Sequence, residues 1–404
     1  MADDIVFLSE GTVTSPRGFL AGAIRAGIRP DVDKLDVGML YAEAPCAAAA
    51  VYTSNRVKAA PLLVSQKHLA EGSSQAVIAN SGCANAATGE QGLQDAREMA
   101  ELAAVKLGLA AHDVIMASTG VIGTFLPMQR VRQAVSDLKL TVEGGVDFAR
   151  AIMTTDTRPK YCAARFGYGG HQYNIGGVAK GAGMIHPDMA TMLCFLTSDA
   201  PVAPAYLAVC LREAVDASFN MIDVDSDTST NDTVVALANG LGGGEPIDVD
   251  HPAAGAFHSA LTAVCIHLAK AIVGDAEGAS KFIECRVEGA ASQADARKAA
   301  REVVRSLAVK TAVYGQDPNW GRILAAVGNS GCQMEETKTA LWLSDQCLYR
   351  QGQPQPFDTA ATKLHLGQAE VCIRVDLGLG DASAIAWGAD ITEEYVRLNS
   401  AYTT

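Results

Sequence analysis

The sequence predicts a mixed α/β protein with mixed sheets, and three observations support that fold class. Apolar residues occur in short continuous runs that stop at Gly-, Ser-, Thr- or Asn-rich turns, as buried strands of α/β folds do. Between these runs lie longer segments whose apolar residues recur at helical spacing. Small residues abound, with 38 Gly in 404 residues, and only 19% of residues are charged, which is typical of tight α/β packing.

Composition excludes several classes of protein. The formal net charge is −13 and no run of Lys and Arg occurs, which argues against a nucleic-acid or anionic-membrane surface. We expect no bilayer span, because the apolar stretches fall short of the ~18 residues required. The acidic start of the chain does not resemble a signal peptide. The ten Cys include no C-x-x-C pair, so we expect buried thiols in a reducing compartment, and hence a cytoplasmic enzyme.

Short strands and helices alternate in the first half of the chain. The strands are expected at 51–53, 76–79 and 114–117, and a further element opens at Ala60. Apolar residues at helical spacing predict a helix over 93–107, which Gly108 ends. The second strand runs into an Asn- and Gly-rich loop and the third into the turn Ser118-Thr119-Gly120. Such strand-end turns present backbone N–H groups to ligands in α/β folds.

The second half begins with a segment that carries no clear pattern. Residues 161–190 are rich in glycine, and they precede an apolar run over 192–196 that suits a strand buried on both faces. The elements expected farther along are a helix at 203–217, a loop at 240–246, a helix at 257–272 closed by Gly274, a strand at 281–288 and a helix at 293–308. Ser292 and Asp295 start this last helix in the manner of a capping box.

The familiar cofactor and metal motifs are incomplete. Gly181-Ala182-Gly183 lacks the third glycine of a dinucleotide fingerprint, and Lys180 lacks the glycine spacing and Ser/Thr of a P-loop. The acidic run 223–227 begins like a calcium loop, but Thr228 stands where the turn glycine belongs, so we interpret the run as a turn. The eight His are scattered without an H-E-x-x-H motif, and we therefore expect no metal.

Eight short motifs stand out together along the chain. They are NSGCANA (80–86), STGVIG (118–123), TTDT (154–157), KGAGMIHPDMATML (180–193), DTSTND (227–232), DAEGASK (275–281), DPNWGR (317–322) and RLNSAYTT (397–404). In this order, from about Gly18 to the end, the chain resembles the glutamate N-acetyltransferase family, also called the ornithine acetyltransferase family. The departures from the family pattern are Cys83, Ala87 and Ser226, and they concern loop geometry.

The resemblance implies a precursor that cuts its own Ala190–Thr191 bond, giving an α chain of 1–190 and a β chain of 191–404. The physical chemistry agrees, because a Thr at a chain start has an α-amino group of pKa near ~8 that can serve as base for its own hydroxyl. Without the resemblance, Thr191 would be a β-branched residue that starts a strand. The implied fold is a layered αββα sandwich with a smaller C-terminal part.

The implied activity is acetyl transfer by a ping-pong route in arginine biosynthesis. Thr191 would take the acetyl group from N2-acetylornithine, release ornithine and pass the group to glutamate. Thr119 and Gly120 match the family's oxyanion hole, although by themselves they would be an ordinary turn. The substrate-binding positions match Thr154, Lys180, Thr191, Glu277, Asn399 and Thr404. Lys180 and Glu277 supply the cation and the anion that a zwitterionic amino acid requires, whereas most such residues are solvated surface groups.

The resemblance also implies an α2β2 heterotetramer and no metal or prosthetic group, and it leaves open whether acetyl-CoA is a second acetyl donor. Three alternatives stand beside it. An amidohydrolase or aminopeptidase with an N-terminal Thr would transfer the acyl group to water. A paralogue would acetylate an intermediate of secondary metabolism. A non-catalytic protein would bind amino acids and remain uncut.

Overall fold

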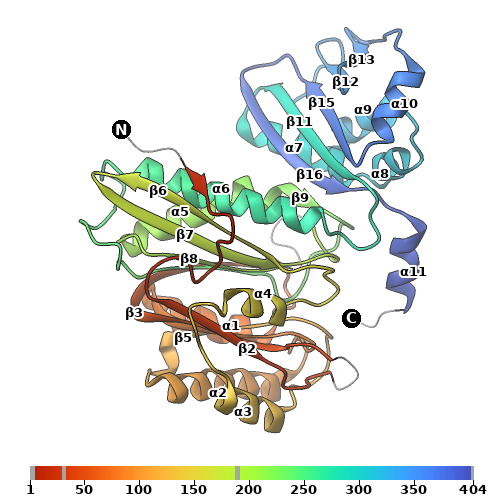
Figure 1. Ribbon diagram of the computed structural model, residues 1–404. Helices are drawn as coiled ribbons and strands as arrows, with labels where there is room; N and C mark the ends of the chain where they lie inside the picture. Colours follow the sequence, from red (N-terminus) through yellow and green to blue (C-terminus); the bar gives the residue numbers. More distant parts are fainter. Residues whose placement is uncertain (1–4, 30–32, 187–191, 402–404) are drawn as a thin grey trace.

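The computed structural model describes residues 5–29, 33–186 and 192–401, and it arranges them around two β-sheets (Figure 1). The larger sheet has nine strands in the order β1-β6-β7-β8-β10-β3-β4-β5, with β2 paired to β3. Their bounds are β1 (Val6–Phe7), β2 (Phe19–Ile24), β3 (Val37–Tyr52), β4 (Ser73–Asn80), β5 (Val114–Ser118), β6 (Lys160–Tyr168), β7 (His171–Lys180), β8 (Leu193–Ser198) and β10 (Thr233–Ala238).

The long strand β3 divides this sheet into two layers. Its first half pairs with β4, where Val37 faces Asn80, and its second half pairs with β10, where Val51 faces Val234. The register with β4 shifts between Tyr41 and Cys46. A shared apolar core fills the space between the layers, with side chains from β2, β3, β4 and β5 on one side and from β7, β8 and β10 on the other. One sheet therefore acts as two facing sheets.

Helices cover both outer faces of the folded sheet. On the β4–β5 side lie α1 (Ala60–His68), α2 (Gly89–Leu107) and α3 (Met128–Asp137), and on the β6–β7 side lie α5 (Pro204–Ala217) and α6 (Ala254–Val273). The short α4 (Gly145–Ala151) packs on β2 beside β3. The order of layers is helix, strand, strand, helix (Figure 1), which confirms the αββα arrangement that the family resemblance implied.

A smaller sheet forms the C-terminal part, in the order β14-β13-β12-β15-β11-β16-β9. Its strands are β9 (Ile222–Asp223), β11 (Phe282–Ala290), β12 (Ala340–Leu343), β13 (Gln346–Arg350), β14 (Gln353–Pro354), β15 (Glu370–Asp376) and β16 (Ala382–Ala389). The helices here are α7 (Gln293–Arg305), α8 (Leu307–Tyr314), α9 (Trp320–Asn329), α10 (Thr359–Leu366) and α11 (Glu393–Ala401), and the 3-10 turns of the chain are η1 (Leu69–Glu71), η2 (Ala111–Asp113) and η3 (Phe219–Met221).

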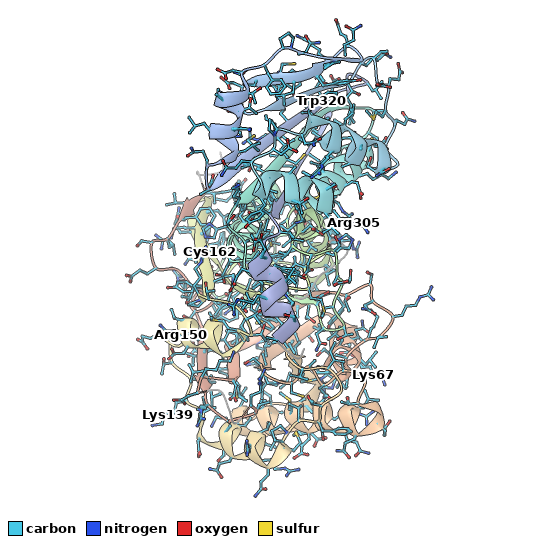
Figure 2. All side chains as sticks on the ribbon, turned by 90° about the vertical axis from the view of Figure 1, so that its right-hand side faces the viewer. Lys67, Lys139, Arg150, Cys162, Arg305 and Trp320 are labelled. Carbon is cyan, nitrogen blue, oxygen red and sulfur yellow. The ribbon has the colours of Figure 1, made fainter. Side chains whose placement is uncertain are left out.

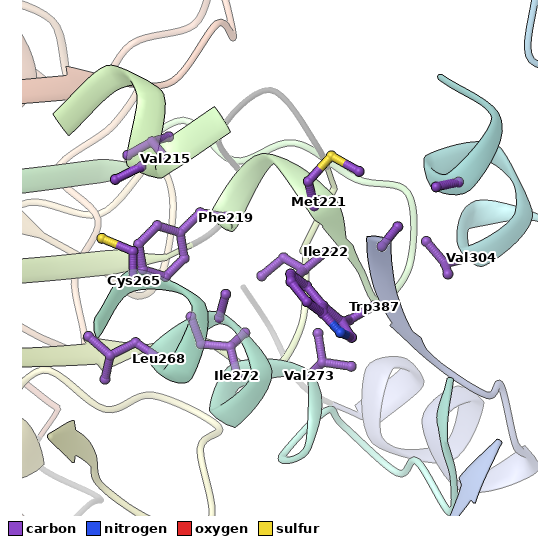
Figure 3. Close-up of a cluster of buried hydrophobic side chains, with 14 of the residues drawn as sticks. Val215, Phe219, Met221, Ile222, Cys265, Leu268, Ile272, Val273, Val304 and Trp387 are labelled. Carbon is purple, nitrogen blue, oxygen red and sulfur yellow. The ribbon is translucent and has the colours of Figure 1, made fainter. Parts of the chain in front are cut away.

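An apolar cluster joins the two parts (Figure 3). Trp387 of β16 and Val304 of α7 pack toward Ile272 and Val273 at the end of α6, and Ile222 of β9 lies beside Trp387. All five side chains are nearly or fully buried. Such packing fixes the C-terminal part against α6, and α11 continues from it along the side of the larger part (Figure 1).

Most of the expected elements are present, and two differ. Residues 161–180 form the β6–β7 hairpin, which sequence patterning left unassigned because its strands contain glycines at positions where backbones approach closely. A Cβ on Gly176 would lie 2.1 Å from the Thr12 carbonyl oxygen. The helix expected at 293–308 ends at Arg305, because the Ser306 hydroxyl accepts the Val309 N–H and starts α8.

The expectations about the cysteines and about the length of apolar stretches have different outcomes. All ten Cys are free and seven of them are buried, as expected of small apolar side chains. The expectation about span length was wrong for α6, which is long and apolar enough to cross a membrane by length and composition alone. Half of its most apolar window is buried in the molecule, where it packs on β6, β7 and α5 as a core helix does.

Candidate active site

A pocket of ≈300 Å³ collects five of the predicted site residues. These are Thr119, Gly120, Thr154, Glu277 and Asn399, which come from three loops and from α11. Lys180, at the end of β7, is buried behind this lining and does not reach the cavity surface. The remaining predicted residues, Ala190, Thr191 and Thr404, lie outside the described residues.

The turn after β5 is held rigidly by its neighbours. The Thr119 N–H donates to the Asn80 carbonyl at 2.9 Å, and the Asn231 amide donates to the carbonyls of Ser118 and Ala84 at 2.8 and 2.7 Å. Gly120 has φ +129°, and a Cβ there would lie 2.4 Å from the Gly82 carbonyl carbon, so only glycine fits. Within the described residues no acceptor takes the Gly120 N–H. This turn can therefore offer a backbone donor to a ligand.

Lys180 places a positive charge directly behind Thr119. Its Nζ donates to Thr119 Oγ1 at 3.3 Å, which leaves the hydroxyl proton of Thr119 free to point elsewhere. Burial lowers the pKa of Lys180, and the carboxylate of Asp156 opposes that effect. A buried cation beside a hydroxyl and a backbone N–H is an arrangement that stabilises negative charge.

A buried ion-pair network lies next to Lys180 and fixes the backbone beside it. Lys160 Nζ lies 2.6 Å from Asp156 Oδ1 and 2.6 Å from Asp275 Oδ2. Asp156 also accepts the N–H groups of Thr154 and Gly181 at 3.0 and 2.7 Å. Burial opposes ionisation of Asp156, but the charges of Lys180 and Lys160 outweigh it and lower its pKa to about 2. One carboxylate thus positions Thr154 on the pocket wall and the backbone that carries Lys180.

The opposite wall is formed by Glu277 and α11. The Glu277 N–H donates to the Ala182 carbonyl at 2.9 Å, and a Cβ on Gly183 would lie 2.4 Å from the Glu277 carboxylate. Asn399 of α11 donates its amide to Glu277 Oε2 at 2.9 Å. Tyr395 donates its hydroxyl to Asp225 Oδ2 at 3.1 Å. These bonds hold α11 over the pocket; Figure 2 shows this helix in front of the middle of the molecule.

The acidic run after β9 supplies more of the wall. Residues 224–226 are a bend, as predicted, while Asp223 belongs to β9. Asp225 accepts the N–H groups of Met184 and Ile185 at 2.5 and 2.8 Å, and burial raises its pKa to about 6. Asp227 also lines the pocket and is exposed. Burial, followed by the charges of Asp225, Glu277 and Asp227, raises the pKa of Tyr395, so the three carboxylates converge near this hydroxyl.

Two buried acids, Asp223 and Asp232, contact the chain on the two sides of residues 187–191. His186 Nδ1 lies 2.9 Å from Asp223 Oδ2, and Lys310 Nζ lies 3.1 Å from Asp223 Oδ1. On the other side, the Met192 N–H donates to Asp232 Oδ1 at 3.0 Å. Asp232 is fully buried, and burial raises its pKa well above the ordinary value for Asp. The two flanks of the predicted cleavage site are therefore anchored by Asp223 and Asp232, which are nine residues apart in one segment of the chain.

Several residues that build this site were not predicted from the sequence. They are Asp156, Lys160, Asp225, Asn231, Asp275 and Tyr395. Asp156, Asn231 and Asp275 lie inside the quoted motifs, which was the available signal. Asp225 lies in the acidic run 223–227, which the sequence predicts to be a turn, whereas Lys160 and Tyr395 lie outside every quoted motif.

Comparisons with known proteins identify the family that this chain resembles. Residues 20–404 match the model of the ArgJ family. A protein of Symbiobacterium thermophilum named arginine biosynthesis bifunctional protein ArgJ is 53% identical over 397 residues, which cover 98% of this chain and 99% of the relative. A protein of the same name from Dehalococcoides mccartyi is 46% identical over 405 residues and covers 100% of both chains. Among solved structures, an ornithine acetyltransferase from Mycobacterium tuberculosis complexed with ornithine is 40% identical, covers 46% of this chain and 98% of its own, and has a TM-score of 0.42.

Proposed function

The chain belongs to the ArgJ family, and on that premise we propose that it is a self-processing acyltransferase of arginine biosynthesis. It moves an acetyl group from N2-acetylornithine to glutamate and so yields ornithine and N-acetylglutamate. The observation that supports this best is the pocket itself, in which Thr119, Gly120, Thr154, Glu277 and Asn399 meet from distant parts of the sequence. Residues placed by a family motif and brought together by the fold are expected of a substrate site.

We assign the nucleophile to Thr191, released by cleavage of the Ala190–Thr191 bond into chains of 1–190 and 191–404. The described neighbours support this position. Gly183 and Met184 line the pocket, and Met192 is held by Asp232. Lys180 pairs with Leu193 across β7 and β8, so the two chains share one sheet after cleavage. They form one catalytic unit rather than two domains.

The reaction then has two symmetrical halves. The Thr191 hydroxyl attacks the acetyl carbonyl carbon while its α-amino group accepts the proton. The carbon–nitrogen bond breaks, the ornithine nitrogen takes the proton, and an acetyl ester of Thr191 remains. The glutamate amine attacks that ester in turn, the carbon–oxygen bond to Thr191 breaks, and the amine proton passes through the α-amino group to the Thr191 oxygen, which restores the free hydroxyl and releases N-acetylglutamate. Each tetrahedral intermediate carries an oxyanion, which the Gly120 N–H and the Thr119 hydroxyl stabilise by about 3–4 kcal/mol per donor.

Lys180 and Glu277 divide the charges of the site. Because Lys180 is buried behind Thr119, its charge acts on the oxyanion through the Thr119 hydroxyl. Glu277 faces the pocket and can accept the α-ammonium group of glutamate or of released ornithine, with Asn399 fixing its carboxylate. Thr154 and Thr404 complete the proposed substrate contacts.

We also propose an α2β2 heterotetramer located in the cytoplasm, where the free thiols of all ten Cys would persist. The mechanism assigns no step to a metal or prosthetic group. Acetyl-CoA is tested as a second donor by incubating it with glutamate in the absence of N2-acetylornithine. Formation of N-acetylglutamate would add that activity, and its absence would limit the enzyme to acetyl recycling.

The decisive experiment is intact mass under denaturing conditions for the wild type and Thr191→Ala. We expect two species of roughly 20 and 22 kDa in the wild type, by proportion of chain length. The variant should remain at 42.1 kDa. A single full-length species in both would refute the nucleophile and favour a binding protein. With cleavage shown, glutamate must accelerate ornithine release from N2-acetylornithine, since a hydrolase would ignore it.

A further inference from the structure

Among the described residues that line the pocket, every charged side chain is an acid. Asp225, Asp227 and Glu277 contribute carboxyl groups, and no Lys, Arg or His is among the described lining residues. Two of these acids already accept hydrogen bonds from other groups of the protein. Asp225 accepts the N–H groups of Met184 and Ile185, and Glu277 accepts the Asn399 amide. Asp227 differs, because its side chain is exposed and, within the described part of the chain, no hydrogen bond or ion pair reaches its carboxylate.

The position of Asp227 is nevertheless fixed by its backbone. Its N–H donates to Asp225 Oδ1 at 3.3 Å, and the preceding Ser226 has a left-handed φ of +68°. Asp225 is tied in turn to the loop before the predicted cleavage site and to Tyr395 of α11. The loop therefore presents one uncommitted carboxylate to the pocket from a constrained backbone, which lowers the entropic cost of binding a cation there.

We propose that Asp227 binds the side-chain ammonium group of N2-acetylornithine and is thereby a specificity-determining residue of the donor half-reaction. This inference rests on the proposed function. The two substrates differ in charge at this end, because ornithine carries an ammonium group where glutamate carries a carboxylate. A carboxylate on the pocket wall attracts the first and repels the second. Asp227 therefore favours the donor and weakens binding of the acceptor.

The test compares two donors that differ only in the ammonium group, N2-acetylornithine and N2-acetylnorvaline. In a ping-pong reaction kcat/KM of each donor reports the donor half-reaction alone. We expect wild type to prefer N2-acetylornithine on the order of tenfold, as for a partly solvated charge-assisted hydrogen bond. In Asp227→Asn that preference should fall toward unity, while kcat/KM for N2-acetylnorvaline stays within about twofold and the KM for glutamate falls about twofold to threefold.

The matched control is Asp345→Asn, which removes the same charge from the exposed turn between β12 and β13 and should change none of these values. A preference that persists in Asp227→Asn would overturn the inference. An equal loss on both donors would do so as well, because it indicates a structural role. If the wild type released no ornithine from N2-acetylornithine, the proposed function would fail first and this inference with it.

Discussion

Replacing Lys160 with Met tests the buried network behind the pocket most directly. Lys160 Nζ lies 2.6 Å from carboxylate oxygens of both Asp156 and Asp275. The side chains of Lys160, Asp156 and Asp275 are 1%, 0% and 5% exposed, so water cannot replace the lost ammonium group. Methionine is apolar and of similar length, so the substitution removes the charge and leaves little cavity. Two carboxylates then remain in a buried site, and Lys180 still acts on Asp156 by its charge.

The magnitude follows from the charges. Removing one partner of a buried ion pair costs about 3–5 kcal/mol, because the other partner stays buried without compensation. The pKa of Asp156 gives a partial check, since it is about 2 in the folded protein and about 3.9 in an unfolded chain. That depression corresponds to roughly 2.6 kcal/mol, which Lys180 and Lys160 share. A depressed carboxyl pKa stabilises the fold above pH ~4, and this contribution is lost as the pH falls through about 2.

The assay is thermal and urea unfolding at several pH values, with Lys298→Met as the control. Lys298, whose side chain is 53% exposed, pairs with Asp295 at 3.8 Å, and such a solvated pair is worth below about 1 kcal/mol. We expect Lys160→Met to lose about 3–5 kcal/mol at neutral pH, and we expect this deficit to narrow as the pH falls, because protonation removes the uncompensated buried charge. If the two variants lost stability equally, the buried network would not contribute as argued.

Three further outcomes are expected. The pKa of Asp225 is raised to about 6, so its carboxyl ionises near that pH and accepts the Tyr395 hydroxyl more strongly above it. We therefore expect kcat/KM to rise through pH 6. The rise should be missing from the pH profile of Asp225→Asn. Gly120→Ala should reduce transfer on the order of 100-fold because a Cβ collides with Gly82, whereas Gly108→Ala, with φ +70° and no atom within 4 Å, should retain activity. Deleting residues 399–404 should abolish transfer without lowering the Tm, because no residue of α11 is buried; full activity in that truncation would remove Asn399 and Thr404 from the site.

The fold was predictable where local pattern and tertiary burial agree. The runs at 76–79 and 114–117 became β4 and β5, and the stripe over 93–107 became α2 with Gly108 in the left-handed conformation. The β6–β7 hairpin was not predictable, because glycines such as Gly176 serve close contacts with other segments and weaken any strand signal. The αββα layering came from the resemblance, since nothing local reveals that β3 belongs to two layers.

The roles of the site residues were harder to predict from the sequence than the fold was, as Asp225 and Asp227 illustrate. In the sequence they are two acids of one run, two residues apart and chemically identical. The fold gives them different roles. Asp225 accepts the backbone N–H groups of Met184 and Ile185, whereas Asp227 is exposed at the pocket. Lys160 and Asp275 make the converse case, being 115 residues apart and 2.6 Å from each other. A motif can therefore indicate which acids and lysines matter. Whether each one supports the scaffold or contacts a substrate depends on the backbone donors and the charged side chains that only the folded chain brings to it.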